Sequence, residues 1–175
     1  MAVTTRRTHG ASDLQLFRQA RRVGRALTAR AWRIASAESC TAGWVTKVLT
    51  DVAGSSAWVE GGYVVYSNAA KMRDLKVPAT TLRRHGAVSE ATVRAMARGA
   101  LRATGADIVL AVSGIAGPGG GTALKPVGTV WFAIATRHRG GKAGATVRRF
   151  RGDREAVRRQ SVAFALQLIL QRALA

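Results

Sequence analysis

The sequence has a single cysteine, three histidines and only nine acidic residues among its 175 residues. With Cys40 alone, the chain can form no internal disulfide, and a cluster of thiolate ligands around a metal is excluded. The histidines, His9, His85 and His138, lie far apart and share no spacing that is typical of metal ligands. We therefore expect neither a metal ion nor another cofactor.

Long apolar runs are also missing. No stretch approaches the ~20 residues that span a bilayer, and the basic N-terminus lacks the apolar core of about 7–15 residues found in a signal peptide. We therefore expect a cytoplasmic protein with no membrane partner. Residues 1–11 are polar and aperiodic, which predicts a flexible N-terminal arm. Residues 12–175 are long enough for one domain with its own core.

Acidic residues are scarce, so the 28 lysines and arginines outnumber them and give a formal net charge of +19. A field of this sign attracts nucleic acid and other anions. The sequence carries no interleaving of aromatic and basic residues and no RNA-binding signature. We therefore favour a solvated basic surface on a protein whose substrate carries phosphate, with nucleic acid bound only non-specifically.

Patterns of helix and strand alternate along the chain. Ser12 and Gln15 have the spacing of a capping box, and Ser89 and Asp153 are placed to cap two further helices. Additional helices are expected at residues 44–49 and 68–75, the second ended by Pro78. Strands are expected at residues 32–37, 58–66, 107–112, 127–136 and 145–151. This order is typical of the α/β class, and the consecutive strands near the end of the chain indicate a mixed sheet.

The first polar segment, residues 38–43 (ESCTAG), turns from a predicted strand into a predicted helix. The unpaired N–H groups of such a turn can bind phosphate or stabilise an oxyanion, and Ser39 is a candidate nucleophile. Ser39 and Thr41 also suit a helix cap, which the local pattern favours over catalysis. Cys40 is a second candidate nucleophile, although a lone cysteine beside a strand is more often buried.

The second polar segment, residues 66–71 (YSNAAK), brings a tyrosine, an amide and a lysine to the start of a helix. Unlike arginine, a buried lysine can lose its proton and act as a base. Lys71 could then take the hydroxyl proton of Ser39, as in serine–lysine catalysis. The alternative is a solvated lysine on a helix surface, and spacing alone favours that alternative.

The third polar segment is the glycine-rich loop at residues 113–126 (SGIAGPGGGTALKP). Its accessible N–H groups suit a phosphate or a ribose at the carboxyl end of a strand. It matches neither the Walker nor the dinucleotide pattern, because no helix with apolar periodicity follows it. A flexible linker is the alternative, which the two flanking buried strands argue against.

Together these segments resemble the C-terminal domain of the CinA family, whose stand-alone members are nicotinamide-nucleotide amidohydrolases. The matching residues are AESCTAG (37–43), DVAGSSAWVEGGYVVYSNAAK (51–71), HGAVSEATV (85–93), SGIAGPGGGTALKPVGTVWFAI (113–134) and GDREAVRR (152–159). They follow one another in the family's order over most of the chain. One departure is Ala42, where members commonly have glycine.

The resemblance implies an α/β class protein, with a single three-layer α/β/α domain over residues 12–175 and a mixed, mostly parallel sheet. It implies hydrolysis of the carboxamide of nicotinamide mononucleotide to nicotinic acid mononucleotide and ammonia. Ser39 would be the nucleophile, Lys71 its base, and Tyr66 a residue that orients the pair or relays the proton. The implied substrate-binding residues are Cys40, Thr41, Ala42, Gly43, Asn68, Ser113, Gly114, Gly117, Gly120, Gly121 and Thr122.

A small-molecule nucleotide is therefore the expected partner. Two other functions stay open: a non-catalytic nucleotide- or RNA-binding module, and a serine–lysine amidase that acts on a different amide. The apolar C-terminal helix would also allow a homo-oligomer.

Overall fold

The computed structural model describes residues 11–175, apart from the side chain of Arg139. Its centre is a five-stranded sheet in the order β2-β1-β3-β4-β5. The strands are β1 (Ile34–Glu38), β2 (Val59–Val64), β3 (Ile108–Gly114), β4 (Thr129–Thr136) and β5 (Ala143–Arg149). β1 pairs in parallel with β2 and β3, and β4 is antiparallel to both β3 and β5. Four strands thus point one way and β4 the other, which confirms the predicted mixed, mostly parallel sheet.

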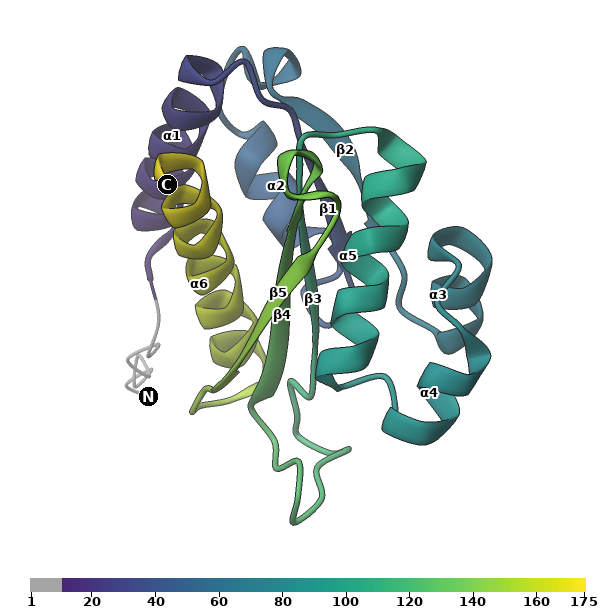
Figure 1. Ribbon diagram of the computed structural model, residues 1–175. Coiled ribbons are helices and arrows are strands. Elements are labelled where there is room, and N and C mark those ends of the chain that lie inside the picture. Colours follow the sequence, from purple (N-terminus) through teal and green to yellow (C-terminus); the bar gives the residue numbers. More distant parts are fainter. Residues whose placement is uncertain (1–10) are drawn as a thin grey trace, which may run out of the picture.

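Helices cover both faces of the sheet (Figure 1). On one face lie α1 (Asp13–Ala29), α2 (Trp44–Thr50) and α6 (Arg154–Leu174). On the other lies α5 (Glu90–Thr104), with α3 (Asn68–Leu75) and α4 (Ala79–His85) packed against it. This confirms the three-layer fold. In the described part of the chain, no helix is long and apolar enough to cross a membrane. The predicted flexible arm, residues 1–11, falls outside the described residues except for Ala11.

α1, α3, α5 and α6 begin where a side chain accepts one of their first N–H groups. Ser12 and Gln15 form the predicted capping box at α1. The side chains of Ser89 and Asp153 accept N–H groups at the starts of α5 and α6. α4 was missed by the sequence analysis, which took Pro78 as the end of a helix. Pro78 instead precedes the first residue of α4, a place where its fixed φ and missing N–H cost little.

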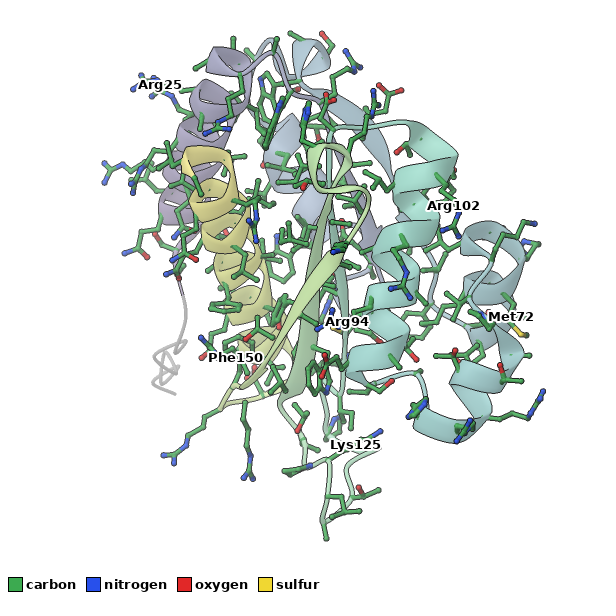
Figure 2. The ribbon with its side chains drawn as sticks, viewed as in Figure 1. Arg25, Met72, Arg94, Arg102, Lys125 and Phe150 are labelled. Atoms are coloured by element: carbon green, nitrogen blue, oxygen red, sulfur yellow. The ribbon has the colours of Figure 1, made fainter. Side chains whose placement is uncertain are left out.

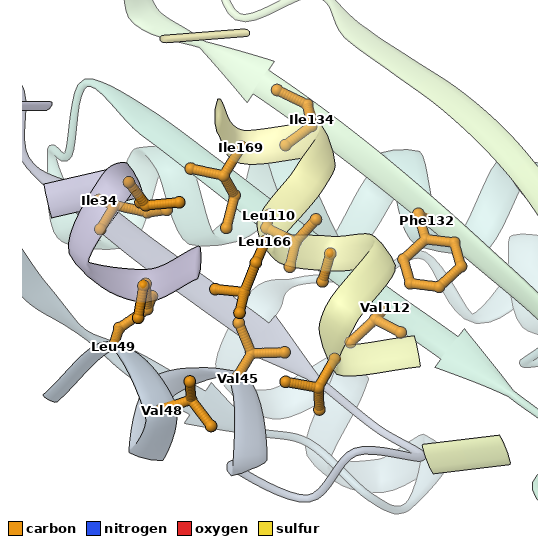
Figure 3. Close-up of a cluster of buried hydrophobic side chains, with 14 of the residues drawn as sticks. Ile34, Val45, Val48, Leu49, Leu110, Val112, Phe132, Ile134, Leu166 and Ile169 are labelled. Atoms are coloured by element: carbon orange, nitrogen blue, oxygen red, sulfur yellow. The ribbon is translucent and has the colours of Figure 1, made fainter. Parts of the chain in front are cut away.

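The core consists of two apolar layers separated by the sheet. In β3, Leu110 and Val112 face the α1–α6 layer, while Val109 and Ala111 face α5. Figure 3 shows the first of these layers, which α6, α2 and the strands build together. Because both faces of β3 are covered, its sequence is a continuous apolar run, as is typical of a central strand.

A close contact between α5 and α3 helps to position Lys71. Gly99 of α5 lies against the last residue of α3, where a Cβ atom would overlap the carbonyl oxygen of Leu75. The two helices therefore meet backbone to backbone at this point, and α5 holds α3 in place. Lys71 belongs to α3, so its position depends on this contact.

We predict that Gly99→Ala destabilises the protein by about 1–3 kcal/mol through overpacking. In a helix without neighbours the same change would stabilise by up to about 1 kcal/mol, because alanine favours helix. Urea unfolding followed by circular dichroism measures the difference. Gly144→Ala is the matched control, since nothing lies within 4 Å of the added methyl group. Equal stability of the two variants would contradict the prediction.

Candidate active site

A pocket of about 190 Å³ opens where β1 and β3 end. It is lined by Ser39, Cys40, Tyr66, Lys71, Ala87, Val88, Ser113, Gly114, Ala116 and Arg154. The three polar segments of the sequence analysis therefore meet here, since each contributes residues to the wall. They meet because parallel strands bring their carboxyl ends to one edge of the sheet, where α/β folds bind ligands.

The Lys71 side chain is completely buried at the base of this pocket. Its Nζ atom donates to Ser39 Oγ at 3.0 Å and to the carbonyl oxygens of Val65 at 2.8 Å and Tyr66 at 3.1 Å. None of the ion pairs among the described residues includes Lys71. Burial in these surroundings disfavours the charged amine and lowers the pKa of Lys71 below its usual 10.5.

Ser39 follows β1 directly and is 7% exposed. Its N–H donates to the carbonyl of Val112, so it continues the pairing with β3. The residue that caps α2 is Gly43, with no side-chain hydrogen bond. The interpretation of Ser39 as a helix cap is therefore wrong: its hydroxyl contacts the lysine amine instead.

Glu38 organises the turn that carries Ser39, a role that the sequence analysis did not assign. The Glu38 carboxylate is fully buried. It accepts hydrogen bonds from the N–H groups of Val45 and Thr46 and from the hydroxyls of Ser36, Thr41 and Thr46. The N–H groups that open α2 are thereby occupied and do not face a ligand. Thr41, an expected substrate contact, is fully buried and bonded to Glu38 instead.

Arg158 of α6 holds the same turn from the other side. Its guanidinium donates to the carbonyls of Cys40 at 3.1 Å and Thr41 at 3.0 Å, and lies 5.3 Å from the ring of Trp44. Because a trans peptide points its N–H away from its C=O, fixing these carbonyls also fixes the N–H groups of Thr41 and Ala42. Within the described residues, the N–H groups of Cys40 and Thr41 donate to no acceptor. Ala42 has a left-handed φ of 52°, a conformation that favours glycine.

The Tyr66 hydroxyl and the Cys40 thiol are less suited to catalysis than their places in the sequence suggested. The Tyr66 side chain is 61% exposed, and its hydroxyl accepts a hydrogen bond from Arg154 at 3.2 Å. Tyr66 contacts Lys71 through its main-chain carbonyl. Burial raises the pKa of the Cys40 thiol to about 12, so the thiolate needed for nucleophilic attack is scarce at neutral pH.

The glycine-rich loop contributes only its first residues. Ser113 and Gly114 line the pocket, and the Ser113 hydroxyl donates to the carbonyl of Ala87. Gly117 contacts the site indirectly, because its carbonyl accepts from Arg154. The tip of the loop extends away from the domain (Figure 1). The expected contacts that do not line the pocket are Thr41, Ala42, Gly43, Asn68, Gly117, Gly120, Gly121 and Thr122.

Arg154 is the charged pocket residue that sequence reasoning missed, together with the apolar lining residues Ala87, Val88 and Ala116. It is the first residue of α6, and its guanidinium joins the glycine-rich loop to Tyr66 at the rim of the pocket. The signal available was the segment GDREAVRR, which was used for the family resemblance but not assigned to the site.

Fold and site together define an α/β protein with a buried serine–lysine pair at the carboxyl edge of a mixed sheet. Residues 17–173 match the model of the CinA C-terminal domain, and the chain belongs to that family. An Escherichia coli relative named nicotinamide-nucleotide amidohydrolase PncC is 56% identical over 161 residues, covering 91% of this chain and 96% of the relative.

Solved structures of the superfamily agree with the fold. A CinA superfamily protein from Klebsiella pneumoniae superposes with a TM-score of 0.86 at 44% identity, covering 91% of this chain and 98% of that one. A competence/damage-inducible protein from Agrobacterium tumefaciens gives a TM-score of 0.87 at 40% identity, covering 95% and 98%.

We predict that Glu38→Gln destabilises the protein by about 3 kcal/mol. An amide has one acceptor oxygen, so its NH₂ group would face the N–H of Val45 or of Thr46 and leave that donor unpaired in a buried place. Thermal or urea unfolding measures the loss. Glu60→Gln is the control, because it breaks the Glu60–Arg33 ion pair, which is partly exposed and worth less than about 1 kcal/mol. A Glu38→Gln variant as stable as the control would refute the role of Glu38.

Proposed function

We propose that the protein hydrolyses the carboxamide of nicotinamide mononucleotide, yielding nicotinic acid mononucleotide and ammonia. The observation that carries this proposal is the 3.0 Å contact between Lys71 Nζ and Ser39 Oγ inside a pocket. The name of the Escherichia coli relative supports the choice of substrate, since that protein matches this chain over nearly its whole length.

The surroundings of Lys71 suit a neutral amine that serves as a base. A neutral amine has two N–H donors and one lone pair. The carbonyls of Val65 and Tyr66 accept the two N–H groups, which leaves the lone pair directed at the Ser39 hydroxyl. In that state Ser39 donates its proton to Lys71, and its oxygen becomes nucleophilic.

The reaction then follows the course of acyl transfer. Ser39 Oγ attacks the carboxamide carbon, and the N–H group of Cys40, which lines the pocket, holds the oxyanion that forms. Such a donor is worth about 3–4 kcal/mol in related enzymes. The protonated Lys71 gives its proton to the departing ammonia, and water then hydrolyses the acyl-enzyme with Lys71 again as the base.

The pocket has room for the reacting end of the substrate. Its volume of about 190 Å³ is below the ~300–1,000 Å³ of sites that enclose a whole ligand. The pyridine carboxamide would enter the pocket, and the ribose phosphate would lie at its rim. Arg154 stands there with its guanidinium held by Gly117 and Tyr66, and arginine binds phosphate through paired N–H groups.

We predict that Ser39→Ala and Lys71→Ala each lower ammonia release from nicotinamide mononucleotide by a factor on the order of 10⁴ or more. Each change removes one half of the nucleophile–base pair. An enzyme-coupled ammonia assay measures the rate, and circular dichroism checks that each variant is folded. Lys142→Ala, which removes an exposed lysine, should keep the wild-type rate.

The same assay separates the remaining functions. A non-catalytic nucleotide- or RNA-binding module would release no ammonia from the wild-type protein. A serine–lysine amidase for another amide would turn over nicotinamide mononucleotide no faster than free nicotinamide. Undiminished turnover in either active-site variant would contradict the role assigned to that residue.

We predict that kcat/KM rises with pH and levels off below pH 10.5. The base is neutral Lys71, and burial lowers the pKa of Lys71 from 10.5. Below the lowered pKa the amine is protonated, and the rate should fall about tenfold per pH unit. Lys71→Arg should remove this ascending limb together with the activity, because arginine stays protonated. A rate that is independent of pH over this range would rule out Lys71 as the base.

A further inference from the structure

The outer face of α1 carries a group of arginines that the active site does not use. We call it the α1 arginine face; its members are Arg18, Arg21, Arg22 and Arg25. All four are exposed and follow the spacing i, i+3, i+4, i+7, which places them on one side of a helix. The opposite side of α1 is apolar and buried, with Leu16, Val23 and Leu27 at most 1% exposed. These arginines are therefore not needed to pack the helix.

No carboxylate side chain of the chain neutralises this face. All nine acidic residues lie within the described residues. Seven of them form ion pairs with other basic residues: Asp13, Asp51, Glu60, Asp74, Glu90, Asp107 and Glu155. The remaining two accept hydrogen bonds, Glu38 at the turn after β1 and Asp153 at the start of α6. The α1 arginine face thus keeps its full charge.

Such an arrangement weakens the isolated helix. Like charges three or four residues apart repel, and this face contains four such pairs. A repulsion of this kind is relieved when an anionic partner binds. The α1 arginine face therefore does not stabilise the helix, and its charge is available to an anionic partner.

The face is separate from the catalytic pocket. No residue of α1 lines that pocket, and Figure 2 shows Arg25 pointing outward on the flank of the domain, away from the end that carries Lys125. The substrate phosphate proposed above would therefore not reach these arginines. An anion that binds the α1 arginine face is therefore a different one from the substrate phosphate.

An apolar cleft of about 580 Å³ runs beside the arginines, between α1 and the segment that precedes β2. Arg21 and Arg25 form one side of it, and Val52, Ala53 and Trp58 contribute apolar surface to the other. Charge and apolar surface thus stand side by side. Nucleic acid offers the matching combination, with phosphates next to sugars and bases.

We propose that the α1 arginine face binds the phosphate backbone of nucleic acid without regard to base sequence. Residues four apart rise about 6 Å along a helix, and the whole face spans about 10 Å. A duplex carries one charge per ~1.7 Å of its axis, so several phosphates lie within that span. Each guanidinium can donate two parallel hydrogen bonds to a phosphate. A membrane is the poorer fit, because a surface-bound helix inserts its apolar side, which is buried here.

The test compares two variants with equal charge. The first changes all four arginines of the α1 arginine face to glutamine. The control changes four exposed arginines of the opposite layer to glutamine, namely Arg83, Arg84, Arg98 and Arg102. Figure 2 shows Arg102 on the side of the molecule opposite Arg25. Fluorescence anisotropy with a short labelled DNA duplex of arbitrary sequence gives the affinity at several salt concentrations.

Wild-type affinity should fall steeply with salt, and the four contacts alone account for about a 150-fold loss between about 50 and 200 mM salt. In the α1 variant, the slope of log K against log salt should be shallower by about 3.6, or about 0.9 per contact. The control should keep nearly the wild-type slope. Both variants should keep wild-type ammonia release, and the α1 variant should melt no lower than wild type, because the repulsion is gone.

Equal loss of duplex binding in the two variants would overturn the proposal, since binding would then reflect net charge alone. It would also be overturned if the α1 variant bound the duplex like wild type but lost binding to vesicles of anionic lipid. Because ammonia release is measured separately, failure of either proposal leaves the other testable.

Discussion

The buried amine of Lys71 is the interaction on which most of this architecture depends. An amine without water or a carboxylate partner needs other acceptors, and here they are the carbonyls of Val65 and Tyr66 at the end of β2. α3 must therefore turn back across that strand end, and it can do so because Gly99 lets α5 approach its last turn. The same demand lowers the pKa of Lys71 and leaves its third contact to Ser39. The packing of α3 and the reactivity of the amine thus both follow from the position of Lys71.

The turn that presents Ser39 is held by two charged groups that do not enter the pocket. Glu38 takes the N–H groups that open α2, and Arg158 takes the carbonyls of Cys40 and Thr41. Glu38 thus binds N–H donors of the turn, and Arg158 binds its carbonyl acceptors. The N–H group of Cys40, which lines the pocket, has no acceptor among the described residues, and a rigid donor of this kind is what an oxyanion requires. The active site is in this sense built from buried polar pairs rather than from a flexible loop.

Sequence patterns predicted most of the fold because local rules and tertiary packing agree there. Ser12 with Gln15, Ser89 and Asp153 cap helices by contacts within three residues. α4 was missed because Pro78 can end one helix or start another, and only packing against α5 decides. The site was predicted less completely. Segments 37–43 and 66–71 were identified, but Thr41 was assigned to the substrate although its hydroxyl serves Glu38.

By itself, the sequence determined the order of the helices and strands other than α4, the excess of positive charge and the family, because these follow from periodicity, composition and extended motifs. Tertiary structure alone decided what each polar side chain does. Ser39 could cap a helix or face a base, and Lys71 could be solvated or buried. Their contact joins positions 32 residues apart. A pattern among neighbouring residues cannot predict a contact over that separation. Burial and hydrogen-bond partners set the chemistry of a side chain, and both exist only once the sheet has brought the strand ends together.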